Sequence, residues 1–137
     1  MNGSYAAGAD LFAEWKGEVT SGTPPTVFPV APDGHPLAGL EVGPGQVVLI
    51  GAPPAAGKTA LVMQMVFDAV KLIPALKAVV CNVEMSPASL LDRQLARLAD
   101  LPLRLVRNRQ LTDAHTAPLA HGLADLGRRL ERVAFVR

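Results

Sequence analysis

The stretch Val47-Val-Leu-Ile-Gly-Ala-Pro-Pro-Ala-Ala-Gly-Lys-Thr59 joins a short apolar run to a loop of small residues. The apolar run, Val47 to Ile50, predicts a strand that is covered on both faces in a parallel sheet. The loop closes on Gly57-Lys58-Thr59, which is how the phosphate-binding P-loop ends between its strand and its helix. The usual P-loop spacing starts here from Ala52 rather than from a glycine. This departure is mild, because an alanine still lets the backbone approach a phosphate.

The residue types in this loop suit a nucleotide. Phosphate oxygens need backbone N–H donors at close range, and only residues with little or no side chain allow that approach. Lys58 is expected to pair with the β- and γ-phosphates and the Thr59 hydroxyl to hold Mg²⁺, while the helix that begins near Lys58 directs its positive end at the same group. The alternative is a Gly/Ala/Pro turn that happens to end in Lys-Thr, which the context of strand and helix disfavours. The residues predicted to bind nucleotide are Ala52, Pro53, Pro54, Ala55, Ala56, Gly57, Lys58, Thr59 and Ala60.

Composition limits the class of protein. The chain has 137 residues, half of them hydrophobic, and a net charge of +1. This balance predicts one globular domain, or part of one, and argues against a partner chosen by bulk charge. No apolar run reaches the roughly eighteen residues of a membrane span, and the first five residues lack the pattern of a secretory signal, so a cytoplasmic protein is expected. The single cysteine, Cys81, lies in an apolar run and is predicted to be buried.

The N-terminal forty residues are the least regular. Asp10–Val19 has the apolar spacing of a short amphipathic helix, with Asp10 as N-cap and Ser21-Gly22 as its stop. A connector rich in proline and glycine then runs to about Leu40. We therefore divide the chain into residues 1–40, a helix and connector, and residues 41–137, the domain that carries the P-loop.

Beyond the P-loop, apolar runs alternate with helical patterns, which predicts an α/β fold with a parallel sheet. A helix over about Lys58 to Leu72 should bury most of its circumference, since its polar side chains form one stripe: Gln64, Asp68 and Lys71. Ser86 should cap the next helix, with Pro87 at its first position. The remaining predicted elements are a strand over Ala78–Val83 parallel to the first, a short turn over 101–109, a helix from about Ala117 to Arg132, and a strand over Val133–Val136.

Glu84 directly follows the second predicted strand. The carboxyl ends of neighbouring parallel strands meet at one edge of a sheet, so Glu84 is expected near the P-loop. A carboxylate there could orient a water for attack on a γ-phosphate. The alternative is an ordinary surface glutamate beside a helix N-terminus, and spacing alone leaves both interpretations open.

Three motifs together resemble the ATPase domain of DnaB-type replicative helicases. They are Gly43–Thr59, with its Ala-first P-loop containing Pro54, then Val83-Glu84-Met85-Ser86, then Arg109-Gln-Leu-Thr-Asp113. The resemblance covers about residues 38 to 137. It implies a RecA-like fold, ATP or ADP with Mg²⁺ as ligands, and Glu84 as catalytic base beside Lys58. It also implies a homo-oligomeric ring of six copies, and single-stranded DNA as a further ligand of the complete protein.

The sequence also departs from that family. No apolar strand ending in aspartate follows Glu84, so the Walker B metal residue is missing, and the DNA-binding loops and arginine finger of the family would lie beyond Arg137. We therefore expect the first half of a RecA-like domain, which binds nucleotide without appreciable turnover on its own. Whether the chain is an enzyme stays open.

Other functions remain as alternatives. One is another RecA-like ATPase, of recombinase or clock type, and another is a non-catalytic module at a helicase subunit interface. A small-molecule P-loop kinase has the least support, because no arginine-rich substrate lid is apparent. The arginines between residues 93 and 109 could face DNA or a neighbouring subunit, but a solvated helix face is favoured. His115 and His121 are interpreted as surface residues.

Overall fold

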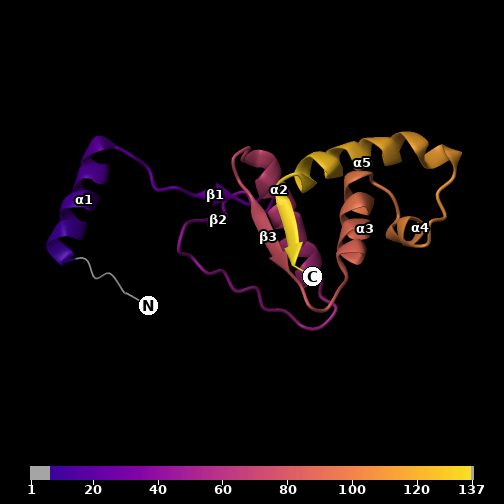
Figure 1. Cartoon of the computed structure of the whole chain (residues 1–137), viewed down its shortest axis with the longest axis horizontal. Coiled ribbons are helices and arrows are strands. Elements are labelled where there is room, and N and C mark those ends of the chain that lie inside the picture. Colours follow the sequence, from indigo (N-terminus) through magenta and orange to yellow (C-terminus); the bar gives the residue numbers. More distant parts are fainter. Residues whose placement is uncertain (1–6, 137) are drawn as a thin grey trace.

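The computed structural model describes residues 7–136, and the N-terminal residues on which the expected lack of a secretory signal rests lie outside that range. The chain combines helices with short strands, as expected of an α/β protein (Figure 1). In chain order the elements are α1 (Gly8–Ser21), β1 (Phe28–Pro29), β2 (Glu41–Val42), α2 (Lys58–Leu72), β3 (Ala78–Cys81), α3 (Pro87–Leu98), α4 (Leu103–Arg107), the short 3₁₀ helix η1 (Asp113–His115), α5 (Thr116–Leu130) and β4 (Val133–Val136). None of these helices is long and apolar enough to cross a membrane.

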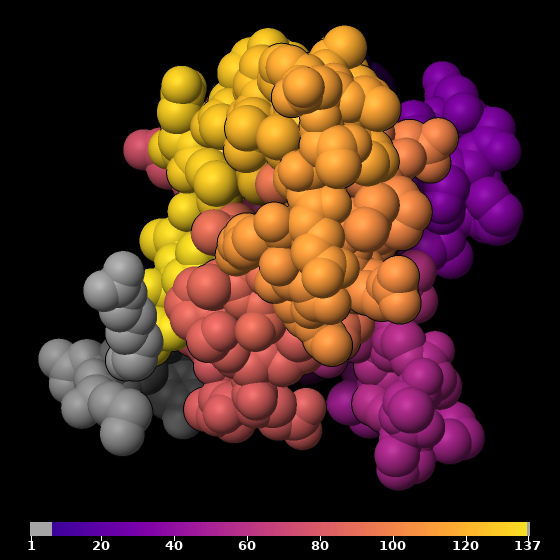
Figure 2. Space-filling model, turned by 90° about the vertical axis from the view of Figure 1, so that its right-hand side faces the viewer, coloured from indigo at the N-terminus to yellow at the C-terminus, as the bar shows by residue number. Residues whose placement is uncertain are grey.

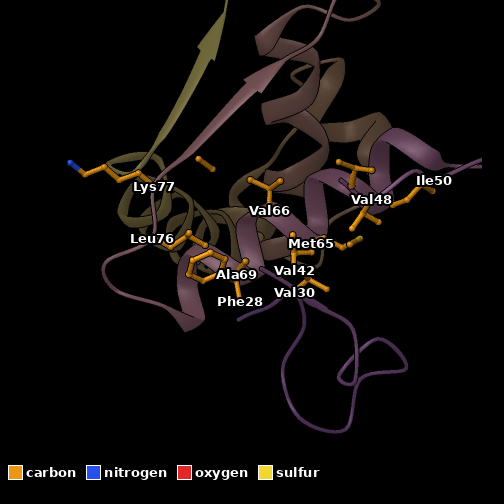
Figure 3. A pocket seen from close by; sticks show the side chains of 12 residues that line it. Phe28, Val30, Val42, Val48, Ile50, Met65, Val66, Ala69, Leu76 and Lys77 are labelled. Atoms are coloured by element: carbon orange, nitrogen blue, oxygen red, sulfur yellow. The ribbon is translucent and has the colours of Figure 1, made fainter. Parts of the chain in front are cut away.

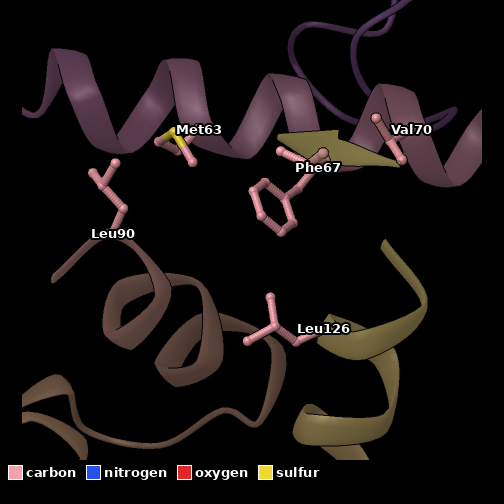
Figure 4. Close-up of a cluster of buried hydrophobic side chains, with 6 residues drawn as sticks. Met63, Phe67, Val70, Leu90 and Leu126 are labelled. Carbon is pink, nitrogen blue, oxygen red and sulfur yellow. The ribbon is translucent and has the colours of Figure 1, made fainter. Parts of the chain in front are cut away.

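The core forms where α2 meets α3, α5 and the strands (Figure 4). Phe67 and Val70 on α2 are completely buried, and Leu90 on α3 is 1% exposed. Each such side chain contributes roughly 1.5–3 kcal/mol by leaving water. The buried cluster consists of Met63, Phe67, Val70, Leu90, Leu126 and Val133. This core holds α2, and therefore the loop before it, against the rest of the chain.

The two long strands are parallel neighbours. β3 pairs with β4 in a register that joins Ala78 to Val133 and Cys81 to Val136, and the predicted strand over Val133–Val136 is confirmed. Side chains alternate between the core and solvent along β3, and Val79 is 68% exposed. The prediction that Cys81 is buried is wrong, because Cys81 lies on the uncovered side of this alternation. The second strand also ends at Cys81 rather than at Val83.

The predicted strand over Val47–Ile50 is wrong. This segment pairs with no strand of the described residues, and Val47 and Leu49 are 94% and 93% exposed. It therefore does not lie in a sheet with β3, as expected. An apolar run predicts burial, but a strand also needs a hydrogen-bonded neighbour, and the run itself does not supply one.

Val48 and Ile50 face α2 instead. They line an apolar cavity of about 370 Å³ together with Val62, Met65 and Ala78 (Figure 3). Phe28, Val30 and Val42 close it from the N-terminal connector, through the antiparallel pair that β1 makes with β2. This pair spans residue 40, where the sequence places a domain boundary, and that boundary stays a prediction.

Local signals predicted most helix ends. α2 runs over the predicted residues, and the Ser86 side chain accepts a hydrogen bond from the Ser89 N–H at 3.2 Å to cap α3. α5 begins at Thr116, one residue before the predicted start, and the predicted turn over 101–109 contains α4. α1 ends at Ser21, and its C-cap Gly22 has a φ of 73°, in the left-handed region. Asp10 lies inside the first turn of α1, after Ala7 as N-cap, so its predicted capping role is wrong.

The polar stripe of α2 does not face solvent as a whole. Asp68 is only 7% exposed, and its carboxylate accepts hydrogen bonds from Arg97 of α3 at 3.1 Å and from Arg129 of α5 at 2.9 Å. A buried charge is tolerated only when it is paired and hydrogen-bonded, which this arrangement provides. Asp68 therefore joins the three helices, and Arg97 is not the fully solvated arginine that the sequence indicated. Figure 2 shows the surface that α3, α4 and α5 form on the side away from α1.

Candidate functional site

The loop before α2 adopts a conformation that depends on its small residues. Gly57 is the N-cap of α2 with φ of 91° and ψ of 13°, a left-handed conformation that side chains disfavour. Ala55 also has a positive φ, 61°, although it carries a Cβ. A non-glycine residue in this region costs roughly 1–3 kcal/mol, and such residues cluster at functional sites. The backbone of the loop is therefore held in a shape that an unconstrained chain would avoid.

Lys58 folds back over this loop. Its Nζ donates hydrogen bonds to the carbonyl oxygens of Ala52 at 2.8 Å and Pro53 at 3.0 Å. The two carbonyls carry only partial negative charge, and an anion would offer the ammonium group a stronger acceptor. Ala52 and Pro53 hold the lysine in place and do not line the pocket beside it.

The N-terminus of α2 presents free donors beside Lys58. The N–H groups in the first turn of a helix have no intrahelical acceptor. Among the described residues no side chain caps α2 to replace that acceptor. Unpaired N–H groups and the helix dipole together make such an end a binding site for an anion. Lys58, Thr59 and Ala60 occupy this first turn and are half-buried.

A polar pocket of about 460 Å³ opens at this helix end. It contains the loop and first-turn residues of the P-loop, the residue predicted as catalytic base, and one arginine from α3. The lining residues are Pro54, Ala55, Gly57, Lys58, Thr59, Ala60, Glu84, Met85 and Arg93. Of the residues predicted to bind nucleotide, Ala52, Pro53 and Ala56 are not among them. The structure thus brings Glu84 to the P-loop although the strand expected beside it is not formed.

Glu84 is placed by a turn rather than directly by a strand end. Asn82 accepts hydrogen bonds through its Oδ1 from the N–H of Glu84 at 2.8 Å and of Met85 at 3.0 Å. Asparagine commonly forms turns of this kind with the backbone two residues later. Asn82 therefore fixes the backbone that carries the Glu84 carboxylate, a role that the sequence analysis did not assign. The sequence signal for this role is an asparagine directly after an apolar run.

Arg93 is the residue of the pocket that the sequence analysis missed. It was interpreted as part of a solvated face, and it is exposed, but it lines the pocket together with Lys58 and Glu84. It lies on α3, whose N-terminus follows the Asn82 turn. The pocket thus combines two cations, free backbone N–H groups, a hydroxyl from Thr59 and one carboxylate. This set fits a phosphate group with an associated divalent cation.

Comparisons with known proteins assign a family. A search of curated proteins found no match to this chain. A sequence model of the DnaB-like helicase C terminal domain matches residues 35–133, which include the P-loop, Glu84 and Arg93. The match spans well over half of the chain, and it agrees with the resemblance carried by the three sequence motifs. The chain belongs to the DnaB-like helicase C-terminal domain family.

Proposed function

We propose that the chain binds ATP or ADP with Mg²⁺ in the pocket between the P-loop and Glu84, as the nucleotide-binding module of a DnaB-like replicative helicase. The observation that carries this proposal is the single pocket shared by Lys58, Thr59, Glu84 and Arg93 at the N-terminus of α2. A RecA-like arrangement of the complete sheet belongs to the same proposal. So does assembly into a ring that couples ATP hydrolysis to unwinding of DNA and contacts single-stranded DNA.

Each residue has a distinct role in this proposal. Lys58 exchanges its two carbonyl contacts for phosphate oxygens, while Gly57 and the first turn of α2 supply backbone N–H donors. Mg²⁺ would neutralise phosphate charge, and Thr59 is the residue that would hold it. Glu84 is positioned by Asn82 to orient a water. Arg93 adds a second positive charge at the phosphates.

Nucleotide titration of the purified chain tests the site. Lys58→Ala removes a charge-assisted contact worth roughly 1.5–3 kcal/mol, so the affinity for ATP with Mg²⁺ should fall about tenfold to hundredfold. The lower end is more realistic, because Lys58 loses two carbonyl hydrogen bonds when it turns to a phosphate. Binding is measured by calorimetry or by fluorescence of a labelled nucleotide.

Lys16→Ala is the matched control. It removes the same type of charge from the exposed face of α1, away from the pocket, and should leave the affinity unchanged. Equal affinities for the unsubstituted chain and Lys58→Ala would refute the role of Lys58 and, with it, the proposed site.

A second candidate is a module that acts at a subunit interface without catalysis. α1 has no buried residue, and four large apolar side chains on it are each more than half exposed, namely Leu11, Phe12, Trp15 and Val19. Phe12 and Trp15 lie against each other, with their ring centroids 5.8 Å apart. Such a surface is typical of contact with another protein. Release of phosphate from ATP distinguishes the two candidates, since turnover that depends on Lys58 would exclude a purely non-catalytic role.

A further inference from the structure

A second polar pocket lies at the opposite end of α2 from the P-loop. It has a volume of about 300 Å³ and is formed by the last turn of α2 and by α5, whose yellow C-terminal end lies beside α2 in Figure 1. Lys58 and Lys71 stand about 20 Å apart along the axis of α2, given a rise of about 1.5 Å per residue. The pocket is therefore separate from the proposed nucleotide site. Its lining residues are Lys71, His121, Asp125, Arg128, Arg129 and Arg132.

Positive charge dominates this pocket. Lys71 and three arginines face one lining carboxylate, Asp125. Arg129 donates to Asp125 at 2.7 Å, and Arg128 lies 3.5 Å from the same carboxylate. Arg129 also pairs with Asp68, which in turn pairs with Arg97. When Asp68 and Arg97 are counted as well, five cations accompany two carboxylates. The cluster thus keeps an excess of about three positive charges.

The ends of two helices account for only part of this excess. α2 and α5 both end here, and each helix C-terminus carries roughly half a negative charge. Arg132 caps the end of α2, since its guanidinium donates hydrogen bonds to the carbonyl oxygens of Ile73 at 2.8 Å and Pro74 at 2.9 Å. An excess of about two positive charges remains. Within the described part of the chain, Lys71 makes no side-chain hydrogen bond or ion pair that would explain its position.

Arg129 provides an independent observation. It is 3% exposed, and its two terminal nitrogens are bonded to the Phe67 carbonyl, Asp68 and Asp125. Its Nε is buried and has no hydrogen-bond partner among residues 7–136. A buried donor without an acceptor has lost its hydrogen bond to water without a replacement, so such groups require an explanation. Arg129 lines the pocket, and an oxyanion bound there would supply negative charge beside this guanidinium.

The pKa of Asp125 is affected by the same positive charges. The hydrogen bond from Arg129 lowers the pKa of Asp125, against the opposing effect of burial, and the charges of Lys71 and Arg128 lower it further. The same cations, Lys71, Arg128 and Arg129, line the pocket.

We propose that this pocket binds a phosphate group, supplied either by free phosphate or by the backbone of a single-stranded nucleic acid. Arginine side chains match the oxygens of a phosphate in bidentate geometry, and lysine adds a point charge. Arg128 and Lys71 are the ligands free to reach it, because both are exposed at the rim of the pocket. Arg129 forms the buried floor of the pocket.

The test uses the full chain with Lys58→Ala, so that phosphate at the P-loop does not contribute. In one arm inorganic phosphate is titrated and the arginine Nε–H signals are followed by NMR. In the other arm a labelled single-stranded oligonucleotide is titrated at low salt. Adding Lys71→Gln and Arg128→Gln together should weaken binding at least roughly tenfold in the arm that supplies the ligand. Because both residues are exposed, their substitution should leave the fold intact.

The control pair is Arg104→Gln with Arg107→Gln, which removes equal charge from the exposed face of α4. A selective loss in the phosphate arm identifies a free-phosphate site, and a selective loss in the oligonucleotide arm identifies a backbone contact. Equal affinity of the Lys71/Arg128 and Arg104/Arg107 variants in both arms, or the lack of binding in both, would overturn the proposal. Neither outcome depends on the nucleotide site, since Lys58 is already substituted.

Discussion

Gly122 of α5 lies tightly against Ala99, the C-cap of α3, and its substitution tests how these helices are held together. A Cβ built on Gly122 would lie 2.6 Å from the Cβ of Ala99 and 3.0 Å from its Cα and backbone nitrogen. These atoms cannot rotate out of the way, as the end of a flexible side chain would. Gly122→Ala must therefore push α5 away from the C-terminal end of α3.

The expected magnitude follows from two opposing effects. Overpacking a tight contact costs about 1–3 kcal/mol, and the fixed backbone of Ala99 places this case near the upper end. Alanine in place of glycine inside a helix recovers about 1 kcal/mol. Gly122→Ala should therefore lower the free energy of unfolding by about 2 kcal/mol. A small domain with a stability of roughly 5–15 kcal/mol loses a large share of it in this way.

Gly127 gives an internal control on the same helix. A Cβ there would meet no atom within 4 Å, so Gly127→Ala should keep only the gain in helix propensity and stabilise the chain by about 1 kcal/mol. Urea unfolding followed by circular dichroism measures both variants under the same conditions. Stability changes of the same sign and size for the two substitutions would refute the close contact between Gly122 and Ala99.

Two further predictions concern carboxylates. Because its folded-state pKa is lowered below 3.8, chiefly by the hydrogen bond from Arg129, Asp125 contributes stability that is present above about pH 4 and is lost as the pH falls through the lowered value. Urea unfolding of the chain and of Asp125→Asn should therefore give curves that separate above about pH 4 and converge in acid, and parallel curves throughout would contradict this role. Glu84→Gln in a ring-forming family protein carrying the same residues should abolish phosphate release while leaving nucleotide affinity nearly intact. Loss of binding together with turnover would instead assign Glu84 to the nucleotide contact.

The parts of the fold that the sequence predicted are those governed by local chemistry. Ser86 caps α3 because its hydroxyl accepts from an N–H three residues later, and Gly57 starts α2 because it tolerates a positive φ. Neither interaction depends on a distant segment, so the residue type alone indicates the conformation. The same applies to Gly22 at the end of α1.

Three of the failures involve partners that are distant in the sequence. Val47–Ile50 has the composition of a buried strand, but pairing requires another strand beside it, which composition does not specify. Asp68 was expected with the polar residues of a helix surface, and its burial depends on Arg97 and Arg129, each about thirty or more residues away. Cys81 became exposed because the covered side of β3 was set by the helices that pack on it.

The residues of the candidate site also separate into those with a local sequence signal and those without one. A contiguous motif predicts Lys58 and Thr59 as site residues, whereas Glu84 is predicted by its position after a strand and by the resemblance to the helicase family. Arg93 had no local signal at all, because an exposed arginine on an amphipathic helix usually faces solvent. Its approach to the P-loop depends on the Asn82 turn, which precedes α3, and on Leu90, which anchors α3 in the core against α2. The geometry of the pocket thus rests on residues that touch no ligand.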